Sequence, residues 1–238
     1  GGSGGRSPPG DFFKIAHYPF ASMVDPSYYD DNMSDYSMTD DESEDTPCAV
    51  KAVSTGYIRS DFTVAGAVTC LNRIQLGTMA WNRVGRSIKL TNLSIRGMIA
   101  GGSNVFMDNC RMVVVYDHQT NGATPVAGDI LKDYRQDGTT ETTAVAFPNQ
   151  ATRERFTIIS DRLIRSPMNT YTGLDPRCEY SVDQRIPLRN LRVQYKQDSN
   201  PAAVADIATG SLWLLTIGQF TAGTFGFYGN FTVEFDDQ

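Results

Sequence analysis

Histidine and long apolar stretches are both scarce in this chain of 238 residues. Its most apolar run, residues 212–217, has the length of a strand and falls well short of the roughly 18 to 20 residues that a membrane-spanning helix needs. The first residues, GGSGGRSPPGDFF, also lack the charged and then apolar pattern of a secretory signal. We therefore expect a soluble protein with no membrane association.

The residues that bind transition metals are few and dispersed. The chain has two histidines and four cysteines, and no two cysteines form a C-x-x-C pair. Because zinc sites are built from clustered Cys and His, this spacing predicts no metal site, and nothing in the sequence points to a cofactor. Without a secretory signal, we expect the cysteines to be reduced and mostly buried thiols.

Signatures of the common enzyme classes give no lead either. The sequence contains no H-E-x-x-H, G-x-x-x-x-G-K-[ST] or G-x-G-x-x-G pattern. His118 is the one histidine after residue 46, and the Asn121-Gly122 pair that follows it indicates a surface turn rather than an acid–base catalyst. No pair of carboxylates stands out by its spacing. We expect that the chain is not an enzyme.

Charge divides the chain into two unequal parts. Residues 25–45 hold nine acidic residues and no Lys or Arg. Residues 46–238 hold 19 basic and 17 acidic residues, so the acidic pI of 4.9 comes from the N-terminal segment. Residues 1–46 are rich in Gly, Pro, Ser, Asp and Tyr and show no sustained period of 2 or 3.6, which predicts an extended acidic N-terminal arm and not a domain.

Three roles remain open for this acidic run. It is a solvated tail, a segment that docks on a basic patch of a neighbouring subunit, or a calcium-binding segment. The fixed spacing of an EF-hand loop is absent, which weakens the third alternative. The arm also carries aromatic and apolar side chains suited to contact with a neighbouring subunit: Phe12, Phe13, Ile15, Tyr18, Phe20, Tyr28 and Tyr29.

From residue 47 onward the chain consists of strand-like runs. Segments rich in Val, Ile, Thr, Phe and Tyr alternate with Gly, Pro, Asn and Asp, a pattern typical of antiparallel β-structure. We predict eight strands, over residues 49–57, 67–76, 87–99, 110–118, 155–164, 182–195, 211–219 and 224–235. Two of the connections far exceed the usual length of roughly four to six residues, and the spacing at 126–134 predicts one or two helical turns. These features favour an eight-stranded antiparallel jelly-roll sandwich with long loops, over residues 47–238.

Periodicity within the runs indicates which faces are buried. In 224–235, Phe and Val fall on one parity, as in a strand with one buried face. Residues 212–217 are apolar on both parities, which predicts a central strand covered on both sides. In 87–99 the apolar side chains change from one parity to the other near Thr91. A similar change occurs in 182–195, between Leu188 and Leu191, so the sequence predicts one β-bulge in each of these strands.

Arginine is the one functional residue type with a distinctive distribution. Residues 151–196 hold nine basic and five acidic residues. Arg-rich strand faces hold phosphates through bidentate contacts that do not depend on base sequence. We therefore predict a nucleic-acid-binding set that consists of Lys89, Arg96, Arg185, Arg189 and Arg192. The alternative is that these are surface or subunit-interface residues paired with carboxylates.

Several segments of the strand-rich region resemble the coat proteins of one group of viruses. The segments are residues 73–77, 82–90, 113–117, 121–125 and 129–131. They are similar to the capsid proteins of Rep-encoding circular single-stranded DNA viruses, the broad CRESS-DNA group that includes circovirus-like and genomovirus-like lineages. The resemblance covers roughly residues 66–135; the rest of the chain matches only in being rich in strands and in ending on an aromatic strand.

The resemblance implies a single jelly roll that self-assembles into the simplest icosahedral shell (T=1, about 60 copies) around a small circular single-stranded DNA genome. It also implies that the protein resides in the virion and, during assembly, in the host cell nucleus; the sequence does not identify a host receptor. Proteins of this family usually carry a basic arm that contacts the DNA, whereas the arm of this chain is acidic. Either a basic segment precedes Gly1, or arginines of the strand-rich region contact the genome.

Assembly of this kind requires matching contact surfaces on every subunit. Met79, Trp81 and Tyr171, in long predicted loops, are candidate subunit-interface anchors because Met and aromatic residues are enriched at interfaces. Each of them would equally well cap the core. The alternative function is a non-viral jelly-roll binding module, lectin-like or a trimeric ligand, without catalysis. A cupin-type enzyme would need a His-rich metal cluster, for which two histidines are too few.

Overall fold

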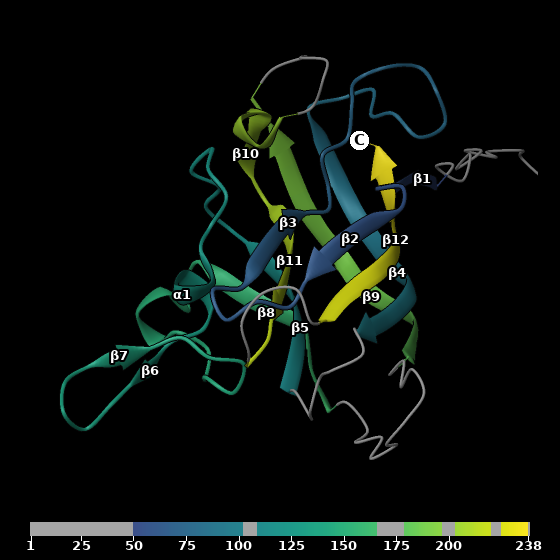
Figure 1. Cartoon of the computed structure of the whole chain (residues 1–238). Helices are drawn as coiled ribbons and strands as arrows, with labels where there is room; N and C mark the ends of the chain where they lie inside the picture. The colour runs from purple at the N-terminus through teal and green to yellow at the C-terminus, as the bar shows by residue number, and fades with distance from the viewer. Residues whose placement is uncertain (1–49, 102–108, 166–178, 197–202, 220–224, 238) are drawn as a thin grey trace, which may run out of the picture. The chain divides into compact units, whose positions relative to one another are not determined.

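The computed structural model describes residues 50–101, 109–165, 179–196, 203–219 and 225–237 (Figure 1). These residues form two antiparallel sheets. In sheet A the strand order is β1-β12-β4-β9-β10, and β2 also pairs with β12. Its strands are β1 (Lys51–Ser54), β2 (Ile58–Asp61), β4 (Ser87–Gly101), β9 (Glu179–Tyr195), β10 (Ile207–Thr209) and β12 (Phe225–Asp237). Sheet B consists, in order, of β3 (Ala67–Cys70), β11 (Ser211–Ile217), β5 (Asn109–Asp117) and β8 (Phe156–Arg165).

This architecture confirms the predicted all-β fold. All eight predicted strands are present, and the chain crosses repeatedly between the two sheets, as expected for a jelly-roll sandwich. The prediction missed β2, β10 and a separate hairpin of β6 (Asp133–Tyr134) and β7 (Thr140–Glu141). These strands have two to four residues each, which is too short for an alternating pattern to be recognised.

The sandwich lies within the unit Asp45–Gln238. Residues 1–46, which we predicted to form an arm, lie outside the described residues, so this remains a prediction. The expected helical turn is present as α1 (Ala127–Ile130), and two further 3-10 turns are η1 (Gln150–Thr152) and η2 (Val204–Asp206). No helix in the described part of the chain is long and apolar enough to cross a membrane.

The space between the sheets is filled by the inward side chains of both. On β12, Phe227, Phe231, Val233 and Phe235 are fully buried, whereas the residues of the opposite parity are more accessible: Tyr228, Asn230, Thr232 and Glu234. This alternation confirms the predicted parity of the last strand and places its aromatic face in the main core.

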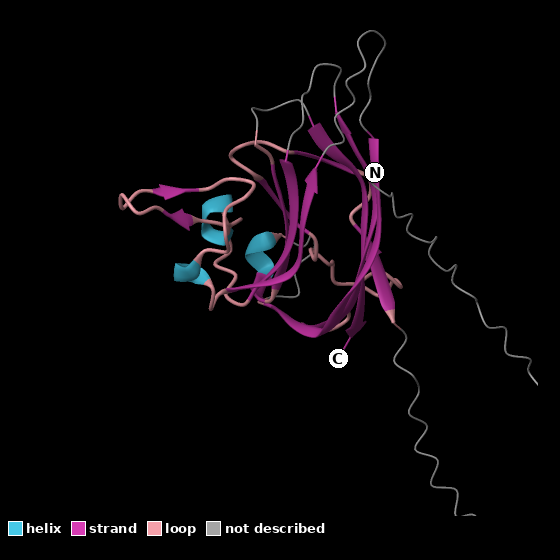
Figure 2. Ribbon diagram, turned by 90° about the horizontal axis from the view of Figure 1, so that it is seen from below, coloured by secondary structure: helices cyan, strands magenta, loops and turns pink. Residues whose placement is uncertain are grey.

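All seven residues of β11 are buried, which confirms a strand covered on both sides. Leu212 and Leu214 face the main core, while Leu215 and Ile217 belong to a second apolar cluster. The second cluster lies outside sheet B, where α1 and the loop after it pack on the sheet (Figure 2). No described element covers the outer face of sheet A in this way, so the two outer faces of the sandwich differ.

The predicted bulges are present and lie opposite each other in sheet A. On β4 the unpaired residue is Thr91, and on β9 residues 188–190 interrupt the pairing. Arg189 and Asn190 have φ angles of 51° and 60°, a left-handed conformation that is uncommon for residues other than Gly. The bulges shift the buried parity of both strands at the same level, so each strand keeps its apolar side chains in the core on both sides of the shift.

A glycine pair makes room for one aromatic ring of the core. Gly97 of β4 and Gly229 of β12 lie directly opposite each other in the strand pairing. A Cβ atom at either position would lie 2.7 Å from Cζ of the buried Phe227, so the ring occupies the space that side chains would fill. The ring of Phe227 also contacts that of Phe231, with centroids 5.2 Å apart.

We expect Gly97→Ala to destabilise the sandwich, because the new Cβ would collide with the Phe227 ring and with the backbone of β12. Overpacking of this kind costs about 1–3 kcal/mol, which urea denaturation would show as a lower midpoint at unchanged slope. Ser94→Ala, on the outer face of the same strand, is the matched control and should change stability by about 0.5 kcal/mol at most. Equal stability of Gly97→Ala and the unaltered protein would refute this account of the pair.

Candidate assembly and nucleic-acid surfaces

Four of the five residues predicted to bind nucleic acid share the outer face of sheet A. Lys89 and Arg96 on β4, and Arg185 and Arg192 on β9, alternate with buried residues of their strands. Lys89 lies directly opposite Arg192 in the strand pairing. The fifth residue, Arg189, is exposed and lies in the bulge of β9.

Carboxylates on the same face divide this set. Arg185 Nη2 lies 2.8 Å from the Glu234 carboxylate, and Arg96 Nε lies 3.4 Å from Asp183 Oδ1. Both arginines are well exposed, so these ion pairs contribute little to stability, but they neutralise charge on the face. The remaining members take part in neither of these two ion pairs, although Asp236 of β12 lies directly opposite Lys89 in the strand pairing. We call them the basic cluster: Lys89, Arg189 and Arg192.

The connection between β3 and β4, residues 71–86, is organised around a fully buried arginine. Arg83 Nε donates to the Ile74 carbonyl (3.2 Å) and Nη1 donates to the Gly85 carbonyl (2.7 Å), so one guanidinium links two parts of the connection. It also lies over the ring of Tyr195 on β9, 4.1 Å from the centroid. Because a buried charge is costly without such partners, these contacts hold the connection in one conformation.

Asp237, at the end of β12, holds the same connection from the other side. Its carboxylate accepts hydrogen bonds from Lys51 Nζ (2.9 Å) and from the backbone N–H groups of Gly85 (3.2 Å) and Val84. Burial raises the pKa of Asp237, but these hydrogen bonds lower it by more, so that the pKa lies below its ordinary value of 3.8. Lys51 Nζ also donates to the Asn82 carbonyl (3.0 Å), which joins β1, β12 and the connection at one point.

Met79 and Trp81 are displayed by this fixed connection. They are 56% and 55% exposed, which does not support the alternative that they cap the core. Large apolar side chains held at the surface are typical of sites that bind other proteins. Their role at a subunit interface remains a prediction, as does that of Tyr171, which lies outside the described residues.

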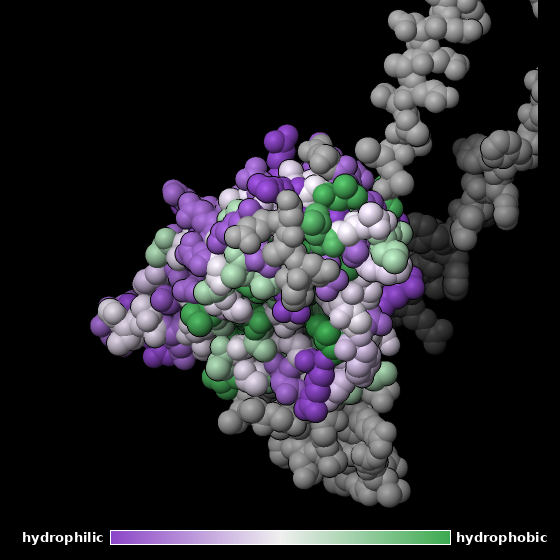
Figure 3. Space-filling model, turned by 90° about the horizontal axis from the view of Figure 1, so that it is seen from above, coloured by the Kyte–Doolittle hydropathy of each residue, from purple (hydrophilic) through white to green (hydrophobic). Residues whose placement is uncertain are grey.

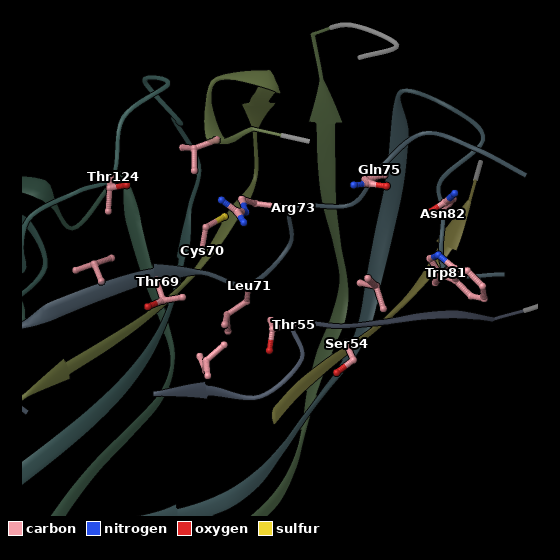
Figure 4. A pocket seen from close by; sticks show the side chains of 14 residues that line it. Ser54, Thr55, Thr69, Cys70, Leu71, Arg73, Gln75, Trp81, Asn82 and Thr124 are labelled. Atoms are coloured by element: carbon pink, nitrogen blue, oxygen red, sulfur yellow. The ribbon is translucent and has the colours of Figure 1, made fainter. Parts of the chain in front are cut away.

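A groove of about 580 Å³ separates the edge strands of the two sheets (Figure 4). Residues of β1 and β2 line one side of it, residues of β3 line the other, and Trp81 lies at one end. Arg73 is the one charged residue among the described lining residues. Cys70 is a free thiol in the groove, and burial raises its pKa to about 11, so it remains protonated and unreactive at neutral pH.

A second exposed apolar surface lies on the connection that covers sheet B. Phe147 is 75% exposed, and Val145 and Leu163 are also exposed. Together they border a hollow of about 340 Å³ that also includes the ion pair of Arg111 with Asp161, whose two hydrogen bonds measure 2.7 and 2.6 Å. Apolar side chains also reach solvent on the side of the molecule shown in Figure 3.

His118 lies at an exposed turn after β5, as predicted. Its Nε2 atom lies 2.8 Å from Thr157 Oγ1, and its ring meets that of Tyr116 edge to face. The neighbouring Asp117 is fully buried and accepts two hydrogen bonds from Arg155, of 2.9 and 2.8 Å, so its carboxylate is committed to a structural ion pair. Within the described residues, no three His, Cys, Asp or Glu side chains are grouped so that they could hold a metal ion.

The charged residues that organise these surfaces were not predicted from the sequence. Arg83, Asp237 and Asp117 belong to residue types that are usually exposed. The two residues joined by the Lys51–Asp237 hydrogen bond are 186 positions apart, and Asp117 and Arg155 are 38 apart. No local pattern identifies these two aspartates as structural when their partners lie so far along the chain. The carbonyl partners of Arg83 are nearer, but backbone acceptors leave no signal in the sequence.

Comparisons with known proteins add little to this description. No protein-family model matches the sequence, and no curated protein matches it. Among solved structures, that of infectious bursal disease virus Gt strain matches at 11% identity over 78% of this chain, with a TM-score of 0.26. The VP2 subviral particle of infectious bursal disease virus matches at 10% identity over 78% of this chain, with a TM-score of 0.25. This chain spans 33% of the length of each, and TM-scores this low do not establish a shared fold.

We expect Asp237→Asn to lower the free energy of unfolding at neutral pH by about 2 kcal/mol, because hydrogen bonds to a charged group are lost. Since the folded-state pKa of Asp237 is depressed, its stabilisation is fully present above 3.8 and is lost as the pH falls through the folded-state pKa. The stability difference between the variant and the unaltered protein should therefore shrink below pH 3.8, in urea titrations at a series of pH values. Asp183→Asn, in an exposed ion pair, is the control. A difference that does not change with pH would contradict this assignment.

Proposed function

We propose that this protein is a viral capsid protein that self-assembles into a small icosahedral shell around a circular single-stranded DNA genome, and that its role is structural and not catalytic. The observation that carries the proposal is the fixed display of Met79 and Trp81, which are exposed although buried Arg83 holds their connection. A surface that must match many identical copies needs apolar side chains in fixed positions. The resemblance of residues 66–135 to capsid proteins of Rep-encoding circular single-stranded DNA viruses supports the same interpretation.

Closed assembly also needs more than one contact surface on each subunit. The surface with Trp81 and the surface with Phe147 lie on different parts of the sandwich, one beside the edge strands and the other outside sheet B. Contacts between unlike surfaces of identical chains form rings when the rotation closes, and several such rings form a shell. Each contact can be weak because every subunit makes several.

The outer face of sheet A is proposed to contact the genome. It is the face that no described element covers, and it carries the basic cluster. Arg96 and Arg185 form ion pairs with Asp183 and Glu234, so they add less net positive charge to this face than the basic cluster does. Phosphate contacts by a few such residues give affinity that does not depend on base sequence. Location in the virion and, during assembly, in the host cell nucleus forms part of the same proposal.

A second candidate function is favoured by the groove. A volume of about 580 Å³ lies within the roughly 300–1,000 Å³ of pockets that bind small molecules. A non-viral binding module of jelly-roll type would use this groove for a ligand. It would form a small oligomer or a monomer, and its thermal stability would rise when a suitable ligand is added.

Electron microscopy and sedimentation velocity of the purified 238-residue chain at near-physiological salt test the capsid proposal. We expect uniform closed particles. The double variant Met79→Ala/Trp81→Ala should raise the protein concentration needed for particle formation by about tenfold or more, so that free subunits predominate at lower concentrations. Tyr180→Ala removes an exposed aromatic residue near the start of β9 and is the control. A chain that stays monomeric under all conditions would exclude a shell.

Binding to single-stranded DNA as a function of salt tests the proposed contact face. The triple variant Lys89→Ala/Arg189→Ala/Arg192→Ala should bind more weakly, and the slope of log affinity against log salt should fall by about 2, because each phosphate contact on a single strand contributes about 0.7. Arg96→Ala/Arg185→Ala is the matched control and should have the smaller effect, since both residues already have carboxylate partners. Equal losses in the two variants would assign no special role to the basic cluster.

A further inference from the structure

The β6–β7 hairpin projects from the sandwich. It pairs with neither sheet, residues 134–140 are all exposed, and Figures 1 and 2 show it extending away from the body of the molecule. A two-stranded hairpin without cover is marginally stable at best in water. A projection of this kind gains stability when another surface covers it.

The tip of the hairpin is nevertheless held in a defined shape. Asp137 accepts hydrogen bonds from the backbone N–H (2.9 Å) and the hydroxyl (2.6 Å) of Thr139, and Gly138 has a φ of 80° between them. These hydrogen bonds lower the pKa of Asp137, so its carboxylate is charged at neutral pH. Arg135 pairs with Glu141 behind the tip. The tip thus presents an exposed, charged carboxylate whose position is set by these hydrogen bonds.

The base of the hairpin is tied to the exposed apolar surface beside it. Asp133 Oδ1 accepts a hydrogen bond from the Phe147 N–H (2.9 Å), and the Tyr134 hydroxyl donates to Asn149 Oδ1 (2.9 Å). Tyr134 is itself more than half exposed. The hairpin therefore presents an aromatic residue and a carboxylate on one element. Its hydrogen bonds to Phe147 and Asn149 set its orientation relative to the connection that covers sheet B.

The groove between the sheets has complementary properties. Its charged residue, Arg73, is exposed, and no acidic residue lines the part that the structure describes. Its apolar side is formed by Val53, Ile58 and Trp81. The strands on either side of it, β1 and β3, each pair with one neighbour only. Open strand edges of this kind accept an extended segment of another chain.

We propose that the β6–β7 hairpin of one copy of this chain occupies the groove of a second copy, with Asp137 beside Arg73 and Tyr134 against Trp81. This inference rests on the proposed function and specifies one of its subunit contacts. No hairpin residue lines the groove of its own chain. Because hairpin and groove are different surfaces, the contact is heterologous and repeats from one copy to the next, as closed rings require.

A charge-reversal series on the full chain tests the contact. Arg73→Asp places two carboxylates together, and Asp137→Arg places two guanidinium groups together; each should raise the concentration needed for particle formation about tenfold or more. The double variant Arg73→Asp/Asp137→Arg restores opposite charges and should recover assembly. Arg153→Asp and Glu154→Arg, at exposed positions of another turn, are the controls for charge reversal alone.

Thermal unfolding of each variant verifies that it is folded, which is expected because both altered residues are exposed. Recovery in the double variant supports the contact. If the unaltered chain assembles and both single variants assemble equally well, the contact is wrong while the capsid proposal stands. If the unaltered chain does not assemble at all, the capsid proposal fails first, and a groove that takes a small ligand becomes the better account.

Cross-linking gives a second measurement that does not depend on particle formation. In the variant Arg73→Cys/Asp137→Cys, made together with Cys70→Ser because Cys70 is a free thiol in the same groove, mild oxidation should join different copies into a ladder of covalent oligomers on a non-reducing gel. Disulfide formation needs Cα atoms within about 7 Å. Either single variant, Arg73→Cys or Asp137→Cys, made with the same Cys70→Ser change should give no ladder. A ladder equally strong in the single variants, or none in the double variant under conditions where particles form, would overturn the proposal.

Discussion

The buried guanidinium of Arg83 is the interaction on which the exposed surface around Trp81 depends. It links two parts of the connection between β3 and β4 and stacks on Tyr195, so that a segment without regular structure acquires one conformation. Burial raises the pKa of Tyr195, whose hydroxyl remains a donor and bonds to the Asn72 carbonyl (2.9 Å). Solvated loops are usually mobile. This connection is held in place because the buried guanidinium at its centre has hydrogen-bond partners within it.

The sandwich separates two kinds of surface. Sheet B carries a second apolar cluster on its outer face and is hidden beneath α1 and the long connection, whereas sheet A presents alternating charges directly to its surroundings. The bulges at Thr91 and at 188–190 keep the apolar side chains of β4 and β9 in the core along their whole length. The outer face of sheet A can therefore be polar without a loss of buried area in the core.

The sequence predicts the sandwich well because its strands obey a local rule. Alternation in β12, the two-sided apolar pattern of β11 and the parity change at Thr91 each depend on residues within one strand, and all three are present in the structure. Pairing order is a different matter, since β1 pairs with β12 across most of the chain. Nothing in either run identifies the other as its neighbour.

The candidate surfaces were less predictable for a related reason. Exposed basic residues on strands follow from parity, and Lys89, Arg96, Arg185 and Arg192 lie where parity places them. Which of them keeps its charge depends on carboxylates brought from other strands, such as Glu234 on β12. The groove, with β1 and β2 on one side and β3 on the other, likewise exists only after the two sheets have packed.

The pairing of β1 with β12 sets the order of events during synthesis of the chain. Sheet A closes only when Phe225–Asp237 has left the ribosome, because β12 joins β1 and β2 to β4. Asp237 then completes the junction with Lys51 and Val84, so a nascent chain lacks the finished surface around Trp81. Pairings between distant segments also form slowly. The surface around Trp81 is therefore completed only after the strands that flank it have been joined by β12.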